Sequence, residues 1–266
     1  MLRGQVAMIT GAAGAIGRAM AHGFMREGAS LALVDTHQQR LSELENALAA
    51  HYDRERFRVF LADVRSTQQI QEAFRLTVGA FGRLDILVNN AAVTQIKPVD
   101  EILDADIDLI IDVNLKGYIK CAREAVQIMK RLKIQGCLLF ISSKNGLVGA
   151  AEKPLYCASK AGEINLARSL AVELGRSGIR VNTICPDAVM EGSALWDRGS
   201  GYLEATAKRY GIPIEKIPEY YRSRSALRTT IEAEDVANAA LFLVSDRASK
   251  MTGNILTVDG GVAFVR

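Results

Sequence analysis

Tyr156 and Lys160 are the residues of this sequence with the clearest potential for chemistry, because they lie four positions apart in residues 155–175, a segment with helical spacing. Both side chains should therefore project from one face of a helix. A tyrosine hydroxyl is a poor base at its ordinary pKa of about 10, and a nearby ammonium group is expected to lower that pKa. Ser143, which precedes Tyr156 by 13 residues, could hydrogen-bond the same substrate oxygen. The alternative is that Tyr156 and Lys160 are solvated residues of a surface helix.

A glycine-rich segment, residues 10–17 with the sequence TGAAGAIG, stands where a buried strand should pass into a helix. Gly11 permits a tight turn, Gly14 lets the backbone approach a pyrophosphate, and Gly17 allows close helix packing. The helix N-terminus that follows favours an anion. The pattern predicts a nucleotide-binding turn, against the alternative of glycines that only end a strand.

Asp35 ends the second predicted strand, 18 residues after Gly17. A carboxylate at this place can accept hydrogen bonds from the ribose hydroxyls of adenosine and would repel a 2′-phosphate. No arginine follows directly, and Arg40 comes only after four intervening residues. The sequence therefore favours NAD over NADP, whereas the alternative for Asp35 is a helix N-cap.

Seven short apolar runs alternate with amphipathic segments, a pattern typical of an α/β domain with buried parallel strands and helices on both faces. The runs are residues 6–10, 31–34, 59–61, 86–88, 138–141, 181–184 and 255–258. We expect all seven strands to be fully buried. Ligands of such sheets bind beyond the carboxyl ends of the strands, where the glycine-rich turn, residues 89–92 and Ser143 all fall.

No linker or repeat divides the chain, so we expect residues 1–266 to form one domain. Residues 187–228 interrupt the alternation, and five of the eight Trp and Tyr residues of the chain lie there. Such a concentration of aromatic residues predicts a packed lid over a substrate site.

The composition excludes several classes of protein. Lys and Arg number 33 against 30 Asp and Glu, so the net charge of +3 gives no sign of a nucleic-acid partner. The three histidines all fall within the first 51 residues, which argues against a histidine-rich metal site and against Ser-His-Asp catalysis. No apolar stretch approaches the roughly 20 residues of a membrane helix. Without a secretory signal or a CxxC pair, we expect a cytoplasmic protein with buried, inert thiols and no bound metal.

Taken together in chain order, these motifs resemble those of short-chain dehydrogenases/reductases over essentially the whole length. The matching elements are T-G-x-x-x-G-x-G at residues 10–17, Asp63-Val64, Asn89-Asn90-Ala91-Ala92, Asn114, Ser143, Tyr156-x-x-x-Lys160, Pro186, and Thr252-Gly253 with Val258-Asp259-Gly260-Gly261. The resemblance implies a single-domain Rossmann fold with a doubly wound, seven-stranded parallel sheet, and an enzyme that acts on CH–OH groups with NAD. It also implies a homotetramer formed through the helices near residues 104–133 and 155–175.

The same resemblance assigns roles to individual residues. Tyr156 would be the general acid/base, Ser143 would position the substrate oxygen, Lys160 would bind the nicotinamide ribose and lower the pKa of Tyr156, and Asn114 would hold a proton-relay water. The residues expected to bind cofactor are Gly11, Gly14, Ala15, Ile16, Gly17, Asp35, Asp63, Val64, Asn90, Ala91, Tyr156, Lys160, Pro186 and Val189. The residues expected to bind substrate are Ser143, Lys144, Tyr156, Asp187 and Trp196.

Three positions depart from the family pattern. Ala92 stands where glycine is usual, a change that should leave cofactor binding intact. Asp187 replaces the glycine that usually follows Pro186, and Glu191 replaces a common threonine. The last two changes affect the expected contacts near the nicotinamide carboxamide.

Two groups within the family share further segments with this chain. Residues 134–149 and 210–221 resemble sorbitol-6-phosphate 2-dehydrogenases, while residues 186–196 resemble the dehydrogenase domain of bifunctional rhamnulose-phosphate aldolase/alcohol dehydrogenases. Both resemblances imply a sugar or polyol substrate, in some cases an anionic one. Lys144 is the candidate for binding a substrate anion, the alternative being a solvated lysine at a strand end.

Two other functions remain open at this stage. One is a reductase of another carbonyl class, such as a 3-oxoacyl thioester or a steroid, although Arg198, Arg222 and Arg224 among the tyrosines favour polar ligands. The other is a non-catalytic NAD-binding regulator, against which the intact set of Asn114, Ser143, Tyr156 and Lys160 argues.

Overall fold

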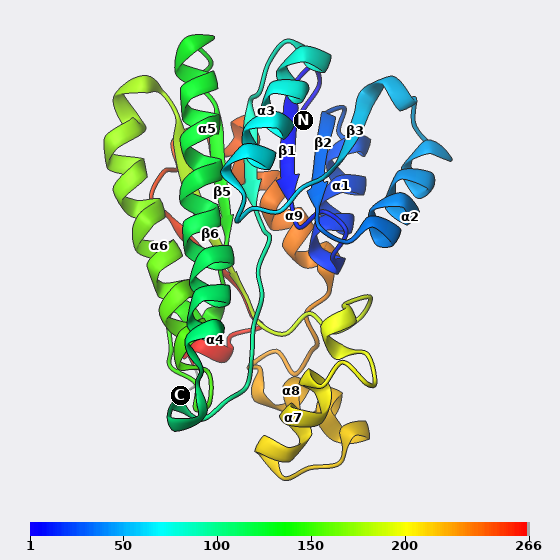
Figure 1. The fold of residues 1–266 in the computed structure, drawn as a ribbon, viewed down its shortest axis with the longest axis vertical. Helices are drawn as coiled ribbons and strands as arrows, with labels where there is room; N and C mark the ends of the chain where they lie inside the picture. The colour runs from blue at the N-terminus through cyan, green and yellow to red at the C-terminus, as the bar shows by residue number, and fades with distance from the viewer. Residues whose placement is uncertain (265–266) are drawn as a thin grey trace.

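Seven apolar segments pair as parallel strands in the computed structural model, which describes residues 1–264. The strands are β1 (Val6–Thr10), β2 (Ser30–Asp35), β3 (Phe57–Leu61), β4 (Ile86–Asn89), β5 (Cys137–Ile141), β6 (Arg180–Pro186) and β7 (Ile255–Val258). Their order in the sheet is β3-β2-β1-β4-β5-β6-β7. The chain thus winds one way from β1 to β3 and the other way from β4 to β7, which confirms the predicted doubly wound sheet (Figure 1).

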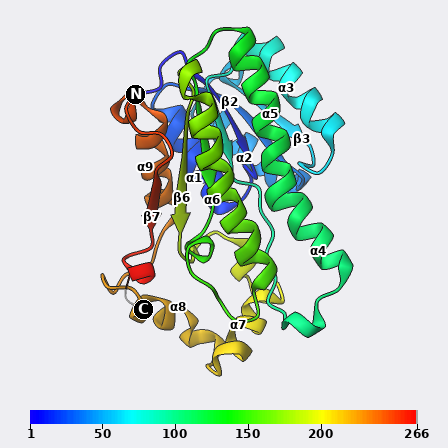
Figure 2. The ribbon, with the colours of Figure 1, turned by 90° about the vertical axis from the view of Figure 1, so that its left-hand side faces the viewer.

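Nine α-helices are described, and those that follow the strands cover both faces of the sheet (Figures 1 and 2). They are α1 (Ala15–Arg26), α2 (Gln38–Ala49), α3 (Thr67–Phe81), α4 (Asp104–Ile110), α5 (Gly117–Arg131), α6 (Pro154–Leu174), α7 (Tyr202–Tyr210), α8 (Ile217–Arg224) and α9 (Ala233–Val244). Within residues 1–264, none of the helices is long and apolar enough to cross a membrane.

The alternation of side chains along the strands produces two cores, one on each face. In β1, Ala7 and Ile9 pack into a cluster with α1, α2 and α9, whereas Val6 and Met8 pack into a second cluster with α3, α5 and α6. Both faces are therefore covered, as parallel sheets require.

The expectation of seven fully buried strands is wrong for β3 and β7. In β3, Val59 and Phe60 are only partly buried and Leu61 is exposed, and all four residues of β7 are only partly buried. The physical reason is their place in the sheet, because these are its two edge strands and each has a neighbouring strand on one side only.

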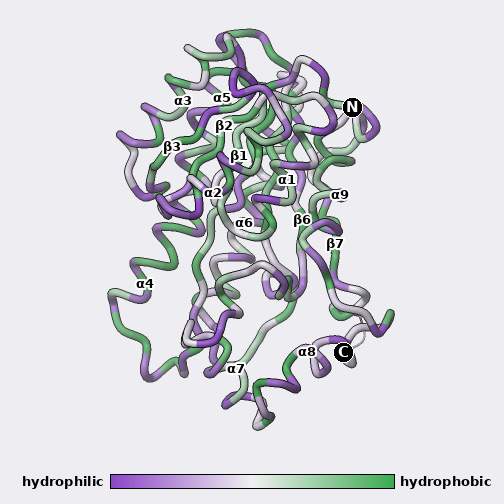
Figure 3. Tube along the Cα trace, turned by 90° about the vertical axis from the view of Figure 1, so that its right-hand side faces the viewer, coloured by the Kyte–Doolittle hydropathy of each residue, from purple (hydrophilic) through white to green (hydrophobic). Residues whose placement is uncertain are grey.

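Residues 187–228 contain α7 and α8 and lie beyond the carboxyl ends of the strands, at the bottom of Figure 1. Their own small core consists of Leu203, Ala207 and Ile217. Along the trace in Figure 3, α7 and α8 alternate between hydrophilic and hydrophobic residues, whereas the central strands are mostly hydrophobic. Apart from Val189, which belongs to the cluster with α1, α2 and α9, the buried apolar residues of the segment pack as a separate unit.

Gly17 provides a test of how tightly α1 is joined to the glycine-rich turn. A Cβ at Gly17 would lie 2.3 Å from the carbonyl oxygen of Gly11 and 2.7 Å from Cα of Ala12, and backbone atoms cannot yield as a side chain can. Overpacking of this kind costs about 1–3 kcal/mol or more. We therefore expect Gly17→Ala to lower the free energy of unfolding by at least about 2 kcal/mol in urea denaturation.

Gly23→Ala, in the same helix, is the matched control, because a Cβ there meets no heavy atom within 4 Å. We expect this variant to be as stable as the parent or more stable by about 0.5–1 kcal/mol. Equal stability of the two variants would contradict the packing argument.

Candidate active site

Tyr156, Lys160 and Ser143 come together at the carboxyl end of β5, as the sequence predicted. Pro154 begins α6, so Tyr156 lies in the first turn of that helix and Lys160 one turn further along. The Nζ of Lys160 lies 5.7 Å from the centroid of the Tyr156 ring. Ser143 follows β5, its hydroxyl accepts a hydrogen bond from the backbone N–H of Asn145 at 3.1 Å, and it also hydrogen-bonds Tyr156. Ser143 and Tyr156 therefore face the same cavity, while Lys160 is buried close to the Tyr156 ring.

The pKa of Tyr156 differs from the expectation. Burial raises the pKa of the Tyr156 hydroxyl above its ordinary value, while the Lys160 ammonium and the hydrogen bond with Ser143 lower it by less. The predicted direction of the Lys160 effect is confirmed, but the expectation of a net lowered pKa is wrong. The physical reason is that the phenolate form loses more stabilisation when burial removes its hydrating water than it gains from the charge of the Lys160 ammonium group.

Glu163 is a residue of this site that the sequence analysis missed. Its carboxylate oxygens lie 2.9 and 3.1 Å from Nζ of Lys160, which also donates to the carbonyl oxygen of Ile141 at 3.0 Å. The side chain is fully buried, and burial raises the pKa of Glu163 to about 8 although Lys160 opposes that shift. The signal in the sequence was a glutamate one turn after Lys160, on the helix face that also carries Ile164 and Ala167.

Asn114 lies in a π-helical turn, Ile111–Lys116, that interrupts the predicted helix between α4 and α5. Its buried amide accepts from N–H of Val93 at 2.9 Å and donates to the Val93 carbonyl oxygen at 2.9 Å and to Oγ of Ser159 at 3.0 Å. Such π turns are frequent at functional sites. Both amide donors of Asn114 are in use, so a relay water could only be bound by its oxygen atoms.

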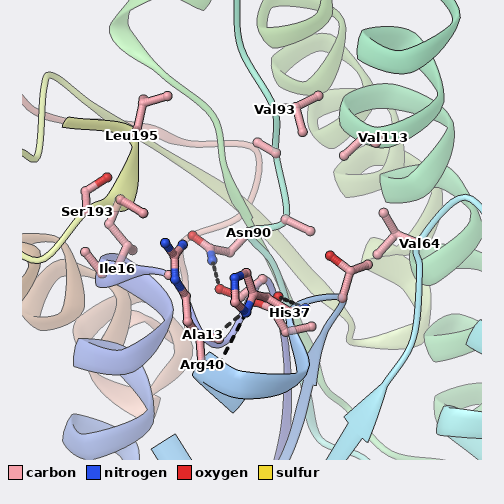
Figure 4. A pocket seen from close by; sticks show the side chains of 18 of the residues that line it. Ala13, Ile16, His37, Arg40, Val64, Asn90, Val93, Val113, Ser193 and Leu195 are labelled. Atoms are coloured by element: carbon pink, nitrogen blue, oxygen red, sulfur yellow. Dashed lines mark hydrogen bonds between the residues drawn. The ribbon is translucent and has the colours of Figure 1, made fainter. Parts of the chain in front are cut away.

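A cavity of about 760 Å³ lies at the carboxyl ends of β1, β2 and β4, within the size range of small-molecule sites. Figure 4 shows Ile16, Ser193 and Leu195 on one side of it, and Val64 and Val113 on the other. The predicted cofactor residues that line it are Gly11, Gly14, Ala15, Ile16, Asp35, Asp63, Val64, Asn90, Ala91 and Val189. Gly17 lies beneath the turn, Tyr156 and Pro186 line the adjoining cavity described below, and Lys160 is buried behind Tyr156.

The glycine-rich turn fits a dinucleotide because it leaves no room for side chains. Gly11 has φ +63°, and a Cβ there would lie 2.8 Å from Cα of Ala91. The Asn90 amide fixes the same turn by donating to the carbonyl oxygens of Thr10 at 3.1 Å and Gly11 at 3.0 Å (Figure 4). Gly14 then caps α1, whose N-terminus faces the cavity and favours a phosphate group.

Two carboxylates line the part of the cavity expected to hold adenosine. Asp35 accepts hydrogen bonds from N–H of Ala13 and of His37, both at 2.9 Å, so it supports the glycine-rich turn as well as lining the cavity. The alternative of Asp35 as a helix N-cap is wrong, because His37 caps α2. Asp63 forms an ion pair with Arg65 at 2.7 Å, which lowers the pKa of its carboxyl group.

A second cavity, of about 190 Å³, adjoins the first, and Ile16, Val189, Ser193 and Leu195 line both. All five residues predicted to bind substrate line the second cavity, namely Ser143, Lys144, Tyr156, Asp187 and Trp196. Trp196 packs edge-to-face on Tyr202 and Tyr221, with ring centroids 5.0 and 5.4 Å away.

Lys144 is not the solvated lysine that the sequence analysis left open. Its side chain is 6% exposed and its Nζ lies 3.2 Å from Oδ1 of Asp187, which is 7% exposed. Asp187, which replaces the usual glycine after Pro186, thus has a structural partner, because its carboxylate balances the charge of the buried Lys144.

The arginines near the tyrosines divide into two groups. Arg198 and Arg222 are largely exposed and pair with Glu215 and Glu219, so they do not line the cavity beside Tyr156. Arg224 does line it. Lys153 and Arg209 line it too, and the sequence analysis missed both.

Comparison with known proteins agrees with this geometry. A family model described as enoyl-(acyl carrier protein) reductase, of the short-chain dehydrogenase type, matches residues 11–263. The uncharacterized oxidoreductase YuxG of Bacillus subtilis is 39% identical over 98% of this chain, but the match covers only 38% of that longer protein. Sorbitol-6-phosphate 2-dehydrogenase of Escherichia coli is 32% identical over 97% of this chain and 98% of its own length.

A 3-oxoacyl-[acyl-carrier-protein] reductase of Thermotoga maritima is equally similar, with 32% identity over 99% of both chains. Among solved structures, sorbitol-6-phosphate 2-dehydrogenase SrlD of Erwinia amylovora superimposes with a TM-score of 0.89 at 30% identity, over 96% of this chain and 98% of that one. The chain therefore belongs to the short-chain dehydrogenase/reductase family of oxidoreductases.

Proposed function

We propose that this protein is an NAD-dependent oxidoreductase of a secondary hydroxyl group, or the corresponding ketone, in a sugar, a polyol or an anionic sugar derivative. The observation that carries the proposal is the small cavity beside Tyr156, whose walls are mostly polar and charged and which opens into the larger, dinucleotide-sized cavity. A substrate with several hydroxyl groups can satisfy such walls, whereas an apolar substrate would leave them without hydrogen-bond partners.

The residues of the chain supply proton transfer and positioning. The nicotinamide ring, when bound, supplies the hydride chemistry. Ser143 donates a hydrogen bond to the substrate oxygen, and Tyr156 exchanges the proton of that oxygen through its hydroxyl. Because burial keeps Tyr156 protonated, it is ready to donate a proton to a ketone. Proton removal from an alcohol relies on the Lys160 ammonium, which Glu163 and the Ile141 carbonyl oxygen hold in place.

A reductase of 3-oxoacyl thioesters is the second candidate, because a relative with that name is as similar as the sorbitol-6-phosphate dehydrogenase. At about 190 Å³, the cavity is smaller than the roughly 300–1,000 Å³ typical of drug-sized ligands, and its polar walls suit a compact polar substrate better than an acyl chain or a steroid. An NAD+ reduction screen across alditols, aldoses, their phosphates and sulfonates, and a 3-hydroxyacyl thioester separates the two candidates.

We also propose that residues 187–228 act as a lid and that the protein works as a cytoplasmic homotetramer. The lid role rests on the cluster of Trp196, Tyr202, Tyr210 and Tyr221, which lines the cavity from α7, α8 and the segment before them. The free cysteines Cys121, Cys137 and Cys185 are buried, and free thiols agree with a reducing compartment. The expectation of buried thiols is wrong for Cys157, which is only partly buried because it lies in the first turn of α6.

The proposed tetramer can be tested by measuring the mass of the protein in solution. Ile119 on α5 and Val172 on α6 are 44% and 85% exposed, which suits helices that pack against a second copy. We expect light scattering to give four times the 28.9 kDa of one chain. A mass of one chain at micromolar concentration would contradict the proposal.

Replacement of Tyr156 tests the mechanism. We expect Tyr156→Phe to lower kcat by about 10²–10⁴-fold, the usual contribution of general acid/base catalysis, because the phenyl ring keeps the packing but loses the proton. NADH affinity, measured by fluorescence titration, should be nearly unchanged. Tyr52→Phe, outside both cavities, is the control and should keep full activity. Full activity of Tyr156→Phe would refute the mechanism.

Replacement of Asp35 tests cofactor choice. Asp35→Asn removes the charge that repels a 2′-phosphate, while Arg40 of the same cavity remains to attract one. We expect the ratio of kcat/KM for NAD+ over NADP+ to fall about tenfold or more, equivalent to ~1.4 kcal/mol. Asp63→Asn is the control, and should leave that ratio unchanged. A parent enzyme that uses only NADP+ would overturn the NAD proposal.

A further inference from the structure

Lys153 is a buried cation beside the proposed acid/base group and has no role in the mechanism above. It immediately precedes α6 and is 5% exposed. Its Nζ lies 5.4 Å from the centroid of the Tyr156 ring and 4.6 Å from that of Tyr202, and it donates a hydrogen bond to the Tyr202 hydroxyl. Lys153 is therefore held between a tyrosine of α6 and a tyrosine of α7.

Lys153 lacks the compensation that the other two buried lysines have. Within residues 1–264, no carboxylate oxygen lies within the 4.0 Å of an ion pair from its Nζ, whereas Lys144 pairs with Asp187 and Lys160 with Glu163. Burial first, and then the nearby charge of Arg209, lowers the pKa of Lys153 to about 8. Holding this cation beside Tyr156 therefore destabilises the folded protein.

Two arginines extend this positive charge along the cavity wall. Arg209 lies seven residues after Tyr202 on α7, hence on the same helix face. Its side chain is 12% exposed, and within residues 1–264 its one ion pair, with the more exposed Glu152, is loose at 3.9 Å. Arg224 of α8 donates to the Tyr210 hydroxyl at 3.4 Å and stacks near Tyr220 and Tyr221, and in the described part of the chain it has no carboxylate partner.

The charges around the cavity therefore do not balance. Its walls include Lys144, Lys153, Arg209 and Arg224, and one carboxylate, Asp187, which is paired with Lys144. Three cations face a small space, and the described residues of its walls offer no further carboxylate to neutralise them. An anion bound in that space would restore the balance and would gain more from each charge than it could in water.

We propose that Lys153 and Arg209 form a binding site for an oxyanion carried by the substrate, so that the substrate is a phosphorylated polyol or sugar. The proposal deepens the proposed function and rests on it for the reacting alcohol. The donors suit a tetrahedral oxyanion: an ammonium group, a guanidinium fork, and the Tyr202 hydroxyl proton, which stays available because Lys153 donates to the Tyr202 oxygen. The alcohol would lie at Ser143 and Tyr156 and the phosphate at Lys153 and Arg209.

The first experiment measures binding without turnover. Calorimetric titration of the full-length protein with inorganic phosphate, with and without saturating NADH, gives a Kd for the site, since NADH blocks phosphate binding at the glycine-rich turn. We expect Lys153→Met and Arg209→Gln each to raise this Kd tenfold or more. Arg222→Gln is the matched control, because Arg222 belongs to the same segment but pairs with Glu219 outside the cavity.

The outcomes decide the proposal in either direction. A phosphate Kd in the parent protein that rises in both cavity variants and stays constant in Arg222→Gln supports the site. Absence of phosphate binding to the NADH complex, or equal affinity in all variants, overturns it. If Lys153→Met fails to fold, Arg209→Gln alone decides, because its partly exposed side chain is less important for packing. Acetate and methanesulfonate titrations show whether a carboxylate or a sulfonate binds in place of phosphate.

A kinetic comparison separates this proposal from the proposed function. We expect kcat/KM for sorbitol 6-phosphate to exceed that for sorbitol at least tenfold in the parent enzyme, and this preference to disappear in Arg209→Gln through a rise in KM. Turnover of neutral polyols without phosphate binding would refute the oxyanion site and leave the proposed function intact. Phosphate binding that depends on Lys153 and Arg209, without turnover of any sugar, polyol or phosphate of either, would support the site and refute the proposed function.

Discussion

The parallel pairing of the strands is the constraint on which the rest of this structure depends. Because all seven strands run the same way, every strand must end at one edge of the sheet, and the residues that follow β1, β4, β5 and β6 meet there. The reversal of winding between β1 and β4 opens the crevice that becomes the larger cavity, of about 760 Å³. The hydrogen bonds of Asn90 to Thr10 and Gly11 close that junction and join the two halves of the sheet.

Buried charge is the second organising feature of the site. Three lysines, Lys144, Lys153 and Lys160, are nearly inaccessible, and a buried charge costs several kcal/mol unless it is paired. Lys144 and Lys160 each have a carboxylate within about 3 Å, in Asp187 and Glu163. The paired carboxylates therefore neutralise Lys144 and Lys160, and these two lysines orient neighbouring side chains instead of attracting an anionic ligand. Lys153, which has no carboxylate partner within residues 1–264, is different, because its field extends into the cavity.

Hydrophobic periodicity and the ends of parallel strands were sufficient to predict the sheet and the meeting of Tyr156, Lys160 and Ser143, whereas the doubly wound order came from the family resemblance. The edge positions of β3 and β7 were not predictable from composition, since strand order decides which strands are edges. Lys153 and Arg209 could not be joined from sequence, because they lie 56 residues apart and come together only where α7 contacts Lys153 through Tyr202. The pKa of Tyr156 likewise depends on burial, which a spacing argument does not measure.

The division of the site between two packing units has a consequence for specificity. Ser143, Tyr156 and Lys160 are fixed by the sheet and α6, within the main cores, whereas Trp196, Tyr202 and Arg209 belong to residues 187–228, whose core of Leu203, Ala207 and Ile217 is separate. Substitutions in that small core or on its aromatic face can therefore reshape the substrate cavity while the acid/base group keeps its geometry. This arrangement accounts for the near-equal similarity of the chain to relatives named for a polyol phosphate and for an acyl thioester, because similarity over the whole length is governed by the sheet and its helices. Under the proposed function, the choice of substrate depends instead on the side chains that line the small cavity beside Tyr156, from Lys153 and from residues 187–228.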